Sequence, residues 1–147
     1  MVPRMHVHAP RLISRSCTSG WFDWVWGDLW LTEDALLRIS RGMAESRKAA
    51  QERKRRGGGS TVPDAGAIEP TTPAELDAKV SSDPKNRRVA LAEIRTAKLR
   101  RGLLNGRLSV VLHDGTRIKV LWLKTDPAYE VLAELLQDRL GSDLKLR

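Results

Sequence analysis

The sequence predicts an α+β domain in which a small antiparallel barrel or two bent sheets, with about six to seven strands, are capped by one C-terminal helix. Three observations predict this fold class. Apolar and polar residues alternate over much of residues 21–40 and 89–123, as in strands with one buried face. Apolar residues recur at helical spacing after residue 126. Residues 41–86, between the two strand regions, are polar, basic and rich in Gly and Pro.

The first strand region contains two expected strands joined by a tight turn. Residues 21–31 are rich in tryptophan and alternate apolar with polar side chains, and residues 35–39 alternate again after the polar break at residues 32–34. Tryptophan favours membrane interfaces and protein contacts, but most of these tryptophans are expected to fill the core of so small a domain.

The second strand region ends in the clearest hairpin of the sequence. Its two arms carry apolar residues at every second position: Leu108, Val110, Leu112, Ile118, Val120 and Trp122. A three-residue loop at 113–115 pairs Val110 with Ile118 and keeps these side chains on one face, whereas a two-residue loop mixes the faces. Gly115 is therefore expected in the left-handed conformation of a bulged hairpin. Residues 89–91 and 94–99 predict two earlier strands, followed by a turn at Asn105-Gly106.

The C-terminal helix is predicted from an apolar stripe with clear start and stop signals. Asp126 is the expected N-cap and Pro127 the first helical residue, and Gly141 is expected to end the helix. The stripe consists of Ala128, Val131, Leu132, Leu135, Leu136 and Leu140. Burial of its larger side chains stabilises by about 1.5–3 kcal/mol each before entropy, so the sheet is expected to depend on this helix.

Two segments are expected to lie outside the packed core. Residues 1–20 predict a disordered N-terminal tail, which leaves residues 21–147 as a single domain. Residues 41–86 predict a flexible basic insertion in that domain, because so polar a segment cannot bury enough apolar area to offset the entropy of ordering it.

Short helices are nevertheless expected within the insertion. Residues 41–56 favour a helix with a thin apolar stripe, which the glycines at 57–59 should end. A second, short helix is expected at Pro73–Val80, with Thr72 as its N-cap and Glu75 as the capping-box partner.

The order of these motifs resembles that of a known family. Residues 27–36, GDLWLTEDAL, resemble the G-x-L-x-L-T-x-x-x-L opening of GRAM and bacterial pleckstrin-homology-like domains. Residues 89–94, VALAEI, resemble their I-P-L-x-x-I strand, and residues 106–121 and 126–140 resemble their later hairpin and closing helix. The resemblance implies a bent antiparallel barrel or pair of sheets with the helix at one end.

The same resemblance implies no binding residue. Lipid-binding members of the family usually carry basic residues in the first hairpin loop, whereas this loop is the acidic Thr32-Glu33-Asp34. Recognition of phosphoinositides in the family's usual mode is therefore not expected, and other members bind peptides or proteins.

The chain is strongly basic, with a formal net charge of +8 and a pI of about 10.2. Such a charge favours nucleic acid, acidic lipid or acidic protein, although a solvated basic surface without a polyanionic partner explains it equally well. The residues expected to contact an anionic partner are Arg47, Lys48, Arg53, Lys54, Arg55, Arg56, Arg95, Lys98, Arg100, Arg101, Arg117 and Lys119. The alternative for those on strands is protection of sheet edges against aggregation.

Cysteine usage and hydropathy suggest the compartment. Cys17 is the single cysteine, so no internal disulfide is expected and a reducing cytoplasm suits the chain. Neither a membrane-spanning helix nor a signal peptide is expected, because no apolar stretch is long enough. The expected location is the cytoplasm, including the periphery of a membrane.

No combination of residues predicts catalysis, a cofactor or a metal site. Residues 57–61 lack the Gly-Lys-Ser/Thr ending of a phosphate-binding loop, and no Gly-x-Ser-x-Gly elbow is present. His6, His8 and Cys17 lack a fourth ligand and a familiar zinc spacing. We therefore expect a non-catalytic binding module that contacts an acidic protein or an anionic membrane surface. A nucleic-acid-binding protein and a structural or oligomerising protein are the alternatives.

Overall fold

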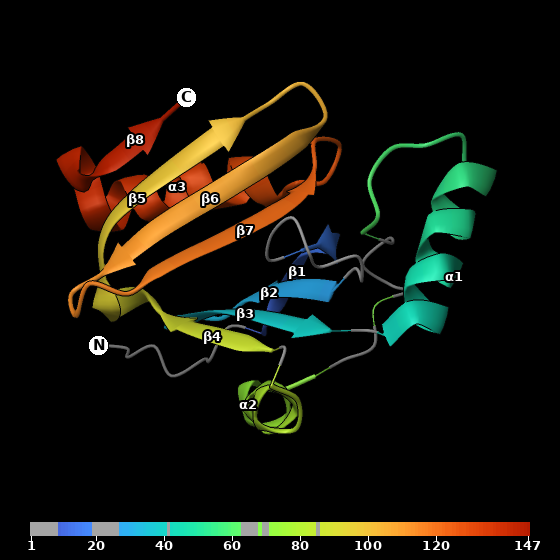
Figure 1. Cartoon of the computed structure of the whole chain (residues 1–147), viewed down its shortest axis with the longest axis horizontal. Coiled ribbons are helices and arrows are strands. Elements are labelled where there is room, and N and C mark those ends of the chain that lie inside the picture. The colour runs from blue at the N-terminus through green and yellow to red at the C-terminus, as the bar shows by residue number, and fades with distance from the viewer. Residues whose placement is uncertain (1–8, 19–26, 41, 63–67, 69–70, 85) are drawn as a thin grey trace, which may run out of the picture.

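The computed structural model describes residues 9–18, 27–40, 42–62, 68, 71–84 and 86–147. Two four-stranded sheets face each other, and one C-terminal helix covers the second (Figure 1). The first sheet, in the order β1-β2-β3-β4, contains β1 (Arg11–Cys17), β2 (Gly27–Leu31), β3 (Ala35–Ser40) and β4 (Arg87–Ala90). The second, in the order β7-β6-β5-β8, contains β5 (Ile94–Arg101), β6 (Asn105–Leu112), β7 (Arg117–Leu123) and β8 (Leu144–Leu146).

This arrangement confirms the predicted α+β class and selects two sheets over a barrel. Neighbouring strands are antiparallel except β5 and β8, which are parallel. The described residues form eight strands, more than the six to seven expected. The sheets meet where Thr18, just after β1, exchanges two backbone hydrogen bonds of 2.9 and 2.8 Å with Leu121 of β7. Among the residues with described positions, the two sheets do not close into a barrel.

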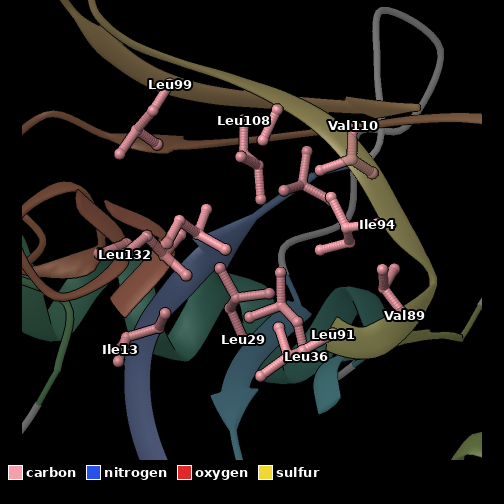
Figure 2. Packing of buried hydrophobic residues seen from close by; sticks show 14 of the residues in the cluster. Ile13, Leu29, Leu36, Val89, Leu91, Ile94, Leu99, Leu108, Val110 and Leu132 are labelled. Atoms are coloured by element: carbon pink, nitrogen blue, oxygen red, sulfur yellow. The ribbon is translucent and has the colours of Figure 1, made fainter. Parts of the chain in front are cut away.

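The main apolar core lies between the two sheets and α3 (Ala128–Leu140). Side chains from all three layers point into the same space (Figure 2). They include Ile13, Leu29, Leu36, Leu99, Leu108, Val110 and Leu132. Alternate residues of each strand face inward, which leaves the remaining side chains of the second sheet for solvent or a ligand.

The hairpin of β6 and β7 has the predicted register. Leu108 pairs with Val120 and Val110 with Ile118, so the loop is residues 113–115 as expected. Gly115 has a φ of +89°, which confirms the predicted positive-φ glycine. The turn at residues 32–34 is also confirmed, because the backbone N–H of Thr32 donates to the Ala35 carbonyl at 2.9 Å.

The prediction of a turn at Asn105-Gly106 is wrong. Both residues belong to β6, where Gly106 pairs with Arg101, and the chain turns at residues 102–104 instead. A Cβ atom on Gly106 would lie 2.1 Å from Nε1 of Trp122, whose side chain is only 1% exposed. The glycine is thus required because a large buried ring crosses its backbone, a constraint that local sequence does not reveal.

The prediction of a disordered tail over residues 1–20 is wrong for residues 11–17. These residues form β1, whose Ile13, Ser14 and Cys17 are completely buried. Because Ser14 and Ser16 are polar, residues 11–17 lack the apolar alternation from which a strand is predicted. Residues 1–8 and the tryptophan-rich residues 19–26 lie outside the described residues.

The predicted insertion contains two helices, α1 (Gly42–Arg55) and α2 (Pro73–Ser81). Thr72 caps α2 as predicted, because its Oγ1 accepts a hydrogen bond of 3.2 Å from the backbone N–H of Glu75. The Glu75 carboxylate accepts from the hydroxyl of Thr71 at 3.0 Å. The buried Leu76 of α2 packs in a second, smaller apolar cluster on the first sheet, with Leu12, Trp30, Leu37 and Ile39. Part of the insertion therefore contributes to the packed structure.

The C-terminal helix begins and ends close to the predicted residues. Leu132 and Leu136 are fully buried, and the Gly141 stop is confirmed by its φ of +53° at the C-cap. Asp126 is not the N-cap, since α3 starts at Ala128 and Pro127 occupies the cap position. After α3, η3 (Gly141–Asp143) leads into β8, which the sequence did not predict.

The chain passes from the first sheet to the second through the short helix η2 (Leu91–Glu93). Val89 lies in β4 as predicted, whereas Leu91 lies just beyond the strand.

None of the helices in the described part of the chain is long and apolar enough to cross a bilayer.

Candidate functional site

The outer face of the second sheet is strongly basic. Ala97, Leu99, Leu108, Val110 and Val120 point into the core, so the residues between them point outward. Six of these outward residues are cationic, and together they form what we call the basic sheet face: Lys98, Arg100, Arg107, Arg117, Lys119 and Lys145.

Strand register brings these charges close together. Arg100 pairs directly with Arg107, and Lys98 pairs with Lys145 on the parallel strand β8. Like charges directly opposite each other destabilise a sheet. In the part of the chain that the structure describes, none of the six side chains forms an ion pair or a hydrogen bond. A bound anion would therefore relieve repulsion without first breaking internal contacts.

The basic sheet face surrounds a hollow of about 700 Å³. The cations that line it are Lys98, Arg107, Arg117, Lys119 and Lys145. Ser109 and Thr96 add hydroxyl groups to the floor, and Asp143 of η3 supplies the one carboxylate among the lining residues. Clefts lined by charges of one sign raise the local concentration of counter-ions, so this hollow favours phosphate or carboxylate groups.

Of the predicted strand residues, four lie on this face and two do not. Lys98, Arg100, Arg117 and Lys119 lie together on the face, whereas Arg95 lies at an irregularity in the pairing of β5 with β6.

Arg101 lies on the side of β5 opposite the basic sheet face. It turns toward α3, donates a hydrogen bond of 2.8 Å to Glu130 and stacks 4.3 Å from the ring centroid of Tyr129. These contacts hold the helix against β5, so Arg101 supports the fold and leaves the face without its charge.

Arg107 and Lys145 belong to the face and were not predicted. Arg107 lies two residues before Ser109 in β6 and points to the same side of the sheet. The alternation of the hairpin could therefore have predicted that Arg107 faces outward. No local pattern could have predicted that Lys145 lies on this face, because its position depends on the pairing of β8 with β5.

The predicted basic residues of α1 form a separate group. Arg47, Lys48, Lys54, Arg55 and Arg56 are exposed on the helix or just after it. Figure 1 shows α1 standing beside the two sheets, and no residue of this helix lines the hollow. Cations in the last turn stabilise a helix through its dipole, which is a structural reason for part of this cluster.

Two arginines of this group fold back onto the glycine-rich loop that follows α1. The Nε of Arg53 donates to the Gly59 carbonyl at 2.7 Å, and Arg56 donates to the Ser60 carbonyl at 2.9 Å. Arg55 pairs with Glu52 at 3.2 Å on an exposed surface. These contacts order the loop and keep the basic end of α1 attached to it.

Asp126 is the most unusual acidic residue of the fold, because its carboxylate is only 1% exposed. One oxygen accepts from the hydroxyls of Ser14 and Ser16, and the other accepts from Ser60 and from the backbone N–H of Thr61. The Thr61 hydroxyl lies within 2.9 Å of both oxygens. We call these five residues the Asp126 cluster.

The Asp126 cluster is structural. It joins β1, the loop after α1 and the start of α3, three segments far apart in sequence. Its donors occupy both carboxylate oxygens, and Asp126 does not line the hollow of the basic sheet face. Buried polar networks of this kind stabilise a fold when every member is hydrogen-bonded.

No group of three or more His, Cys, Asp or Glu side chains that could hold a metal occurs among the described residues. His6 and His8 lie outside those residues. Cys17 is buried in β1, where its thiol lies 3.9 Å from the Thr18 carbonyl.

Comparison with known proteins leaves the family resemblance as a hypothesis. No protein family model matches the chain, and no curated protein is a significant match.

Proposed function

We propose that this chain is a non-catalytic binding module of the pleckstrin-homology-like type, and that its basic sheet face binds an anionic membrane surface. The observation that carries the proposal is the grouping of six cationic side chains, free of internal partners in the described structure, on one face of one sheet. The single carboxylate in the hollow, Asp143, leaves this face strongly positive.

The order of the elements supports the pleckstrin-homology-like assignment. Two mostly antiparallel sheets are present and a helix follows β7, which agrees with the pair of sheets and closing helix that the sequence resemblance implies. The added β8 extends the second sheet and contributes Lys145 to the basic face. The acidic loop at residues 32–34 argues against an anionic ligand at the family's usual site.

A membrane surface suits this face better than nucleic acid. Besides Lys and Arg, the outward strand residues are small polar or aliphatic, among them Thr96, Ser109, Val111 and Leu121. In the described strands they include no aromatic side chain on which a base could stack. A sheet face presents charges in an extended layer, and an anionic leaflet presents phosphates in one. Each Lys or Arg near such a leaflet contributes about 1 kcal/mol. The cytoplasmic leaflet is the anionic one, so the cytoplasmic side of a membrane is the proposed location.

Neutralising two charges of the basic sheet face tests the proposal. We expect Lys98→Gln with Arg117→Gln to weaken binding to vesicles containing phosphatidylserine by about 30-fold, from about 2 kcal/mol of lost attraction. Co-sedimentation with vesicles, followed over a range of lipid concentrations, measures this change.

The matched control removes the same two kinds of charge from another part of the surface. Lys79 lies on α2 and Arg87 on β4, in or beside the first sheet, and both are exposed. Lys79→Gln with Arg87→Gln should weaken binding by less than about threefold through net charge alone. Equal losses in the two double variants would refute a specific role for the basic sheet face.

A further inference from the structure

Two leucines are displayed at the tip of the β5–β6 hairpin. Leu103 is 90% exposed and Leu104 is 78% exposed, the highest values for large apolar side chains among the described residues. The turn is closed by a backbone hydrogen bond of 2.9 Å from Gly102 to Asn105, so neither leucine side chain is needed to form it. Exposing these two side chains to solvent therefore does nothing to stabilise the hairpin.

Basic residues surround this tip. Arg100 on the basic sheet face precedes it by three residues, and Lys124 lies beside it because its backbone N–H donates to the Leu104 carbonyl at 2.9 Å. Lys124 is exposed. The neighbouring Arg107 pairs with Arg100 across the hairpin. The apolar tip is therefore adjacent to the end of the basic sheet face.

A chain of hydrogen bonds also connects the tip to the basic end of α1. Thr125, next to Lys124, donates to the Gly59 carbonyl at 2.6 Å, and the same carbonyl accepts from Arg53 at 2.7 Å. Figure 1 shows the β5–β6 turn and the loop after α1 at the same end of the molecule. The β6–β7 turn lies at the opposite end of the second sheet.

We propose that the tip of this hairpin dips into the bilayer, with Leu103 and Leu104 inserted among the lipid chains while the basic sheet face and Lys124 contact the headgroups. The cations nearest the tip are Arg100, Arg107 and Lys124. The inference rests on the proposed function, because it takes an anionic bilayer as the partner. It adds an apolar anchor and an orientation to the electrostatic attraction.

The size of the patch favours a bilayer over a protein. A stable protein interface buries on the order of 800 Å² on each partner, more than two leucines on a hairpin tip provide. A bilayer requires only a few apolar side chains next to cations, since interfacial binding combines buried apolar area with attraction to anionic lipid. The charges around the tip complement such lipids.

A fluorescent label at the tip tests insertion directly. The variant Leu103→Cys is labelled with a fluorophore that becomes brighter and blue-shifted in an apolar medium. Cys17 is fully buried and should not react. The matched control is His113→Cys, exposed in the turn at the other end of the sheet. With phosphatidylserine vesicles we expect a blue shift from the label at 103 and none from the label at 113.

A second variant measures the contribution of the tip to affinity. Leu103→Ser with Leu104→Ser should keep the melting temperature, because both side chains are exposed, and should bind the same vesicles at least tenfold more weakly.

The outcomes separate the two proposals. Vesicle binding with no blue shift at 103 would overturn insertion and leave the proposed function standing. No binding of the unlabelled chain to acidic vesicles would overturn both. A concentration-dependent dimer that the double serine variant abolishes would also overturn insertion, in favour of self-association through the tip.

Discussion

Asp126→Ala is expected to lower the free energy of unfolding by about 3–5 kcal/mol. The substitution removes the acceptor for Ser14 and Ser16 of β1 and for the backbone N–H of Thr61. A buried donor left without a partner costs about 1–3 kcal/mol, and several are left here. Denaturant unfolding followed by tryptophan fluorescence measures the loss.

Asp126→Asn is the control for this prediction. The asparagine side chain has the same shape and keeps one carbonyl oxygen as an acceptor. Its NH₂ group replaces the other oxygen, which in the native chain accepts hydrogen bonds. Its free energy of unfolding should lie between those of the native chain and the alanine variant, because the hydroxyls can rotate. If alanine and asparagine both leave the unfolding midpoint unchanged, the Asp126 cluster does not hold the three segments together.

Leu132→Ala is expected to lower the free energy of unfolding by about 2–5 kcal/mol. Leu132 is completely buried where α3 packs on both sheets, so its truncation removes apolar contacts and leaves a cavity (Figure 2). Thermal unfolding followed by circular dichroism measures the effect.

Leu103→Ala provides the comparison, since Leu103 is exposed and its truncation should change stability by less than about 0.5 kcal/mol. Leu135→Ala should fall between the two, because Leu135 is only partly buried against the core. Equal effects of the changes at 132 and 103 would contradict the placement of α3.

Local sequence was sufficient for the elements whose signals lie within a few residues. The β6–β7 register followed from apolar alternation and the glycine at 115, and α3 followed from its leucine stripe and Gly141. The cap of α2 by Thr72 followed from the same short-range chemistry. In each case the residues that decide the structure are neighbours in the chain.

The errors arose where a partner distant in sequence decides the structure. Ser14 and Ser16 are polar, yet β1 is buried because Asp126 accepts their hydroxyl protons. Gly106 has the sequence of a turn residue, but Trp122 requires it in a strand.

The residues of the candidate site could likewise be predicted only where strand alternation decides which way a side chain points. Apolar alternation in the β6–β7 hairpin is sufficient to predict that Arg117 and Lys119 point outward. The contacts of Arg101 with Tyr129 and Glu130 could not be predicted, because these partners lie on a helix that the strand pattern does not position.

The most direct test of the central proposal is equilibrium binding of the unaltered chain to vesicles whose phosphatidylserine content is raised stepwise at constant total lipid. We expect binding to increase steeply with acidic lipid, and to fall when salt shortens the Debye length from about 10 Å to about 3 Å. Binding that is equally strong to neutral vesicles, or absent at every composition, would contradict the assignment of the basic sheet face as a membrane-binding surface.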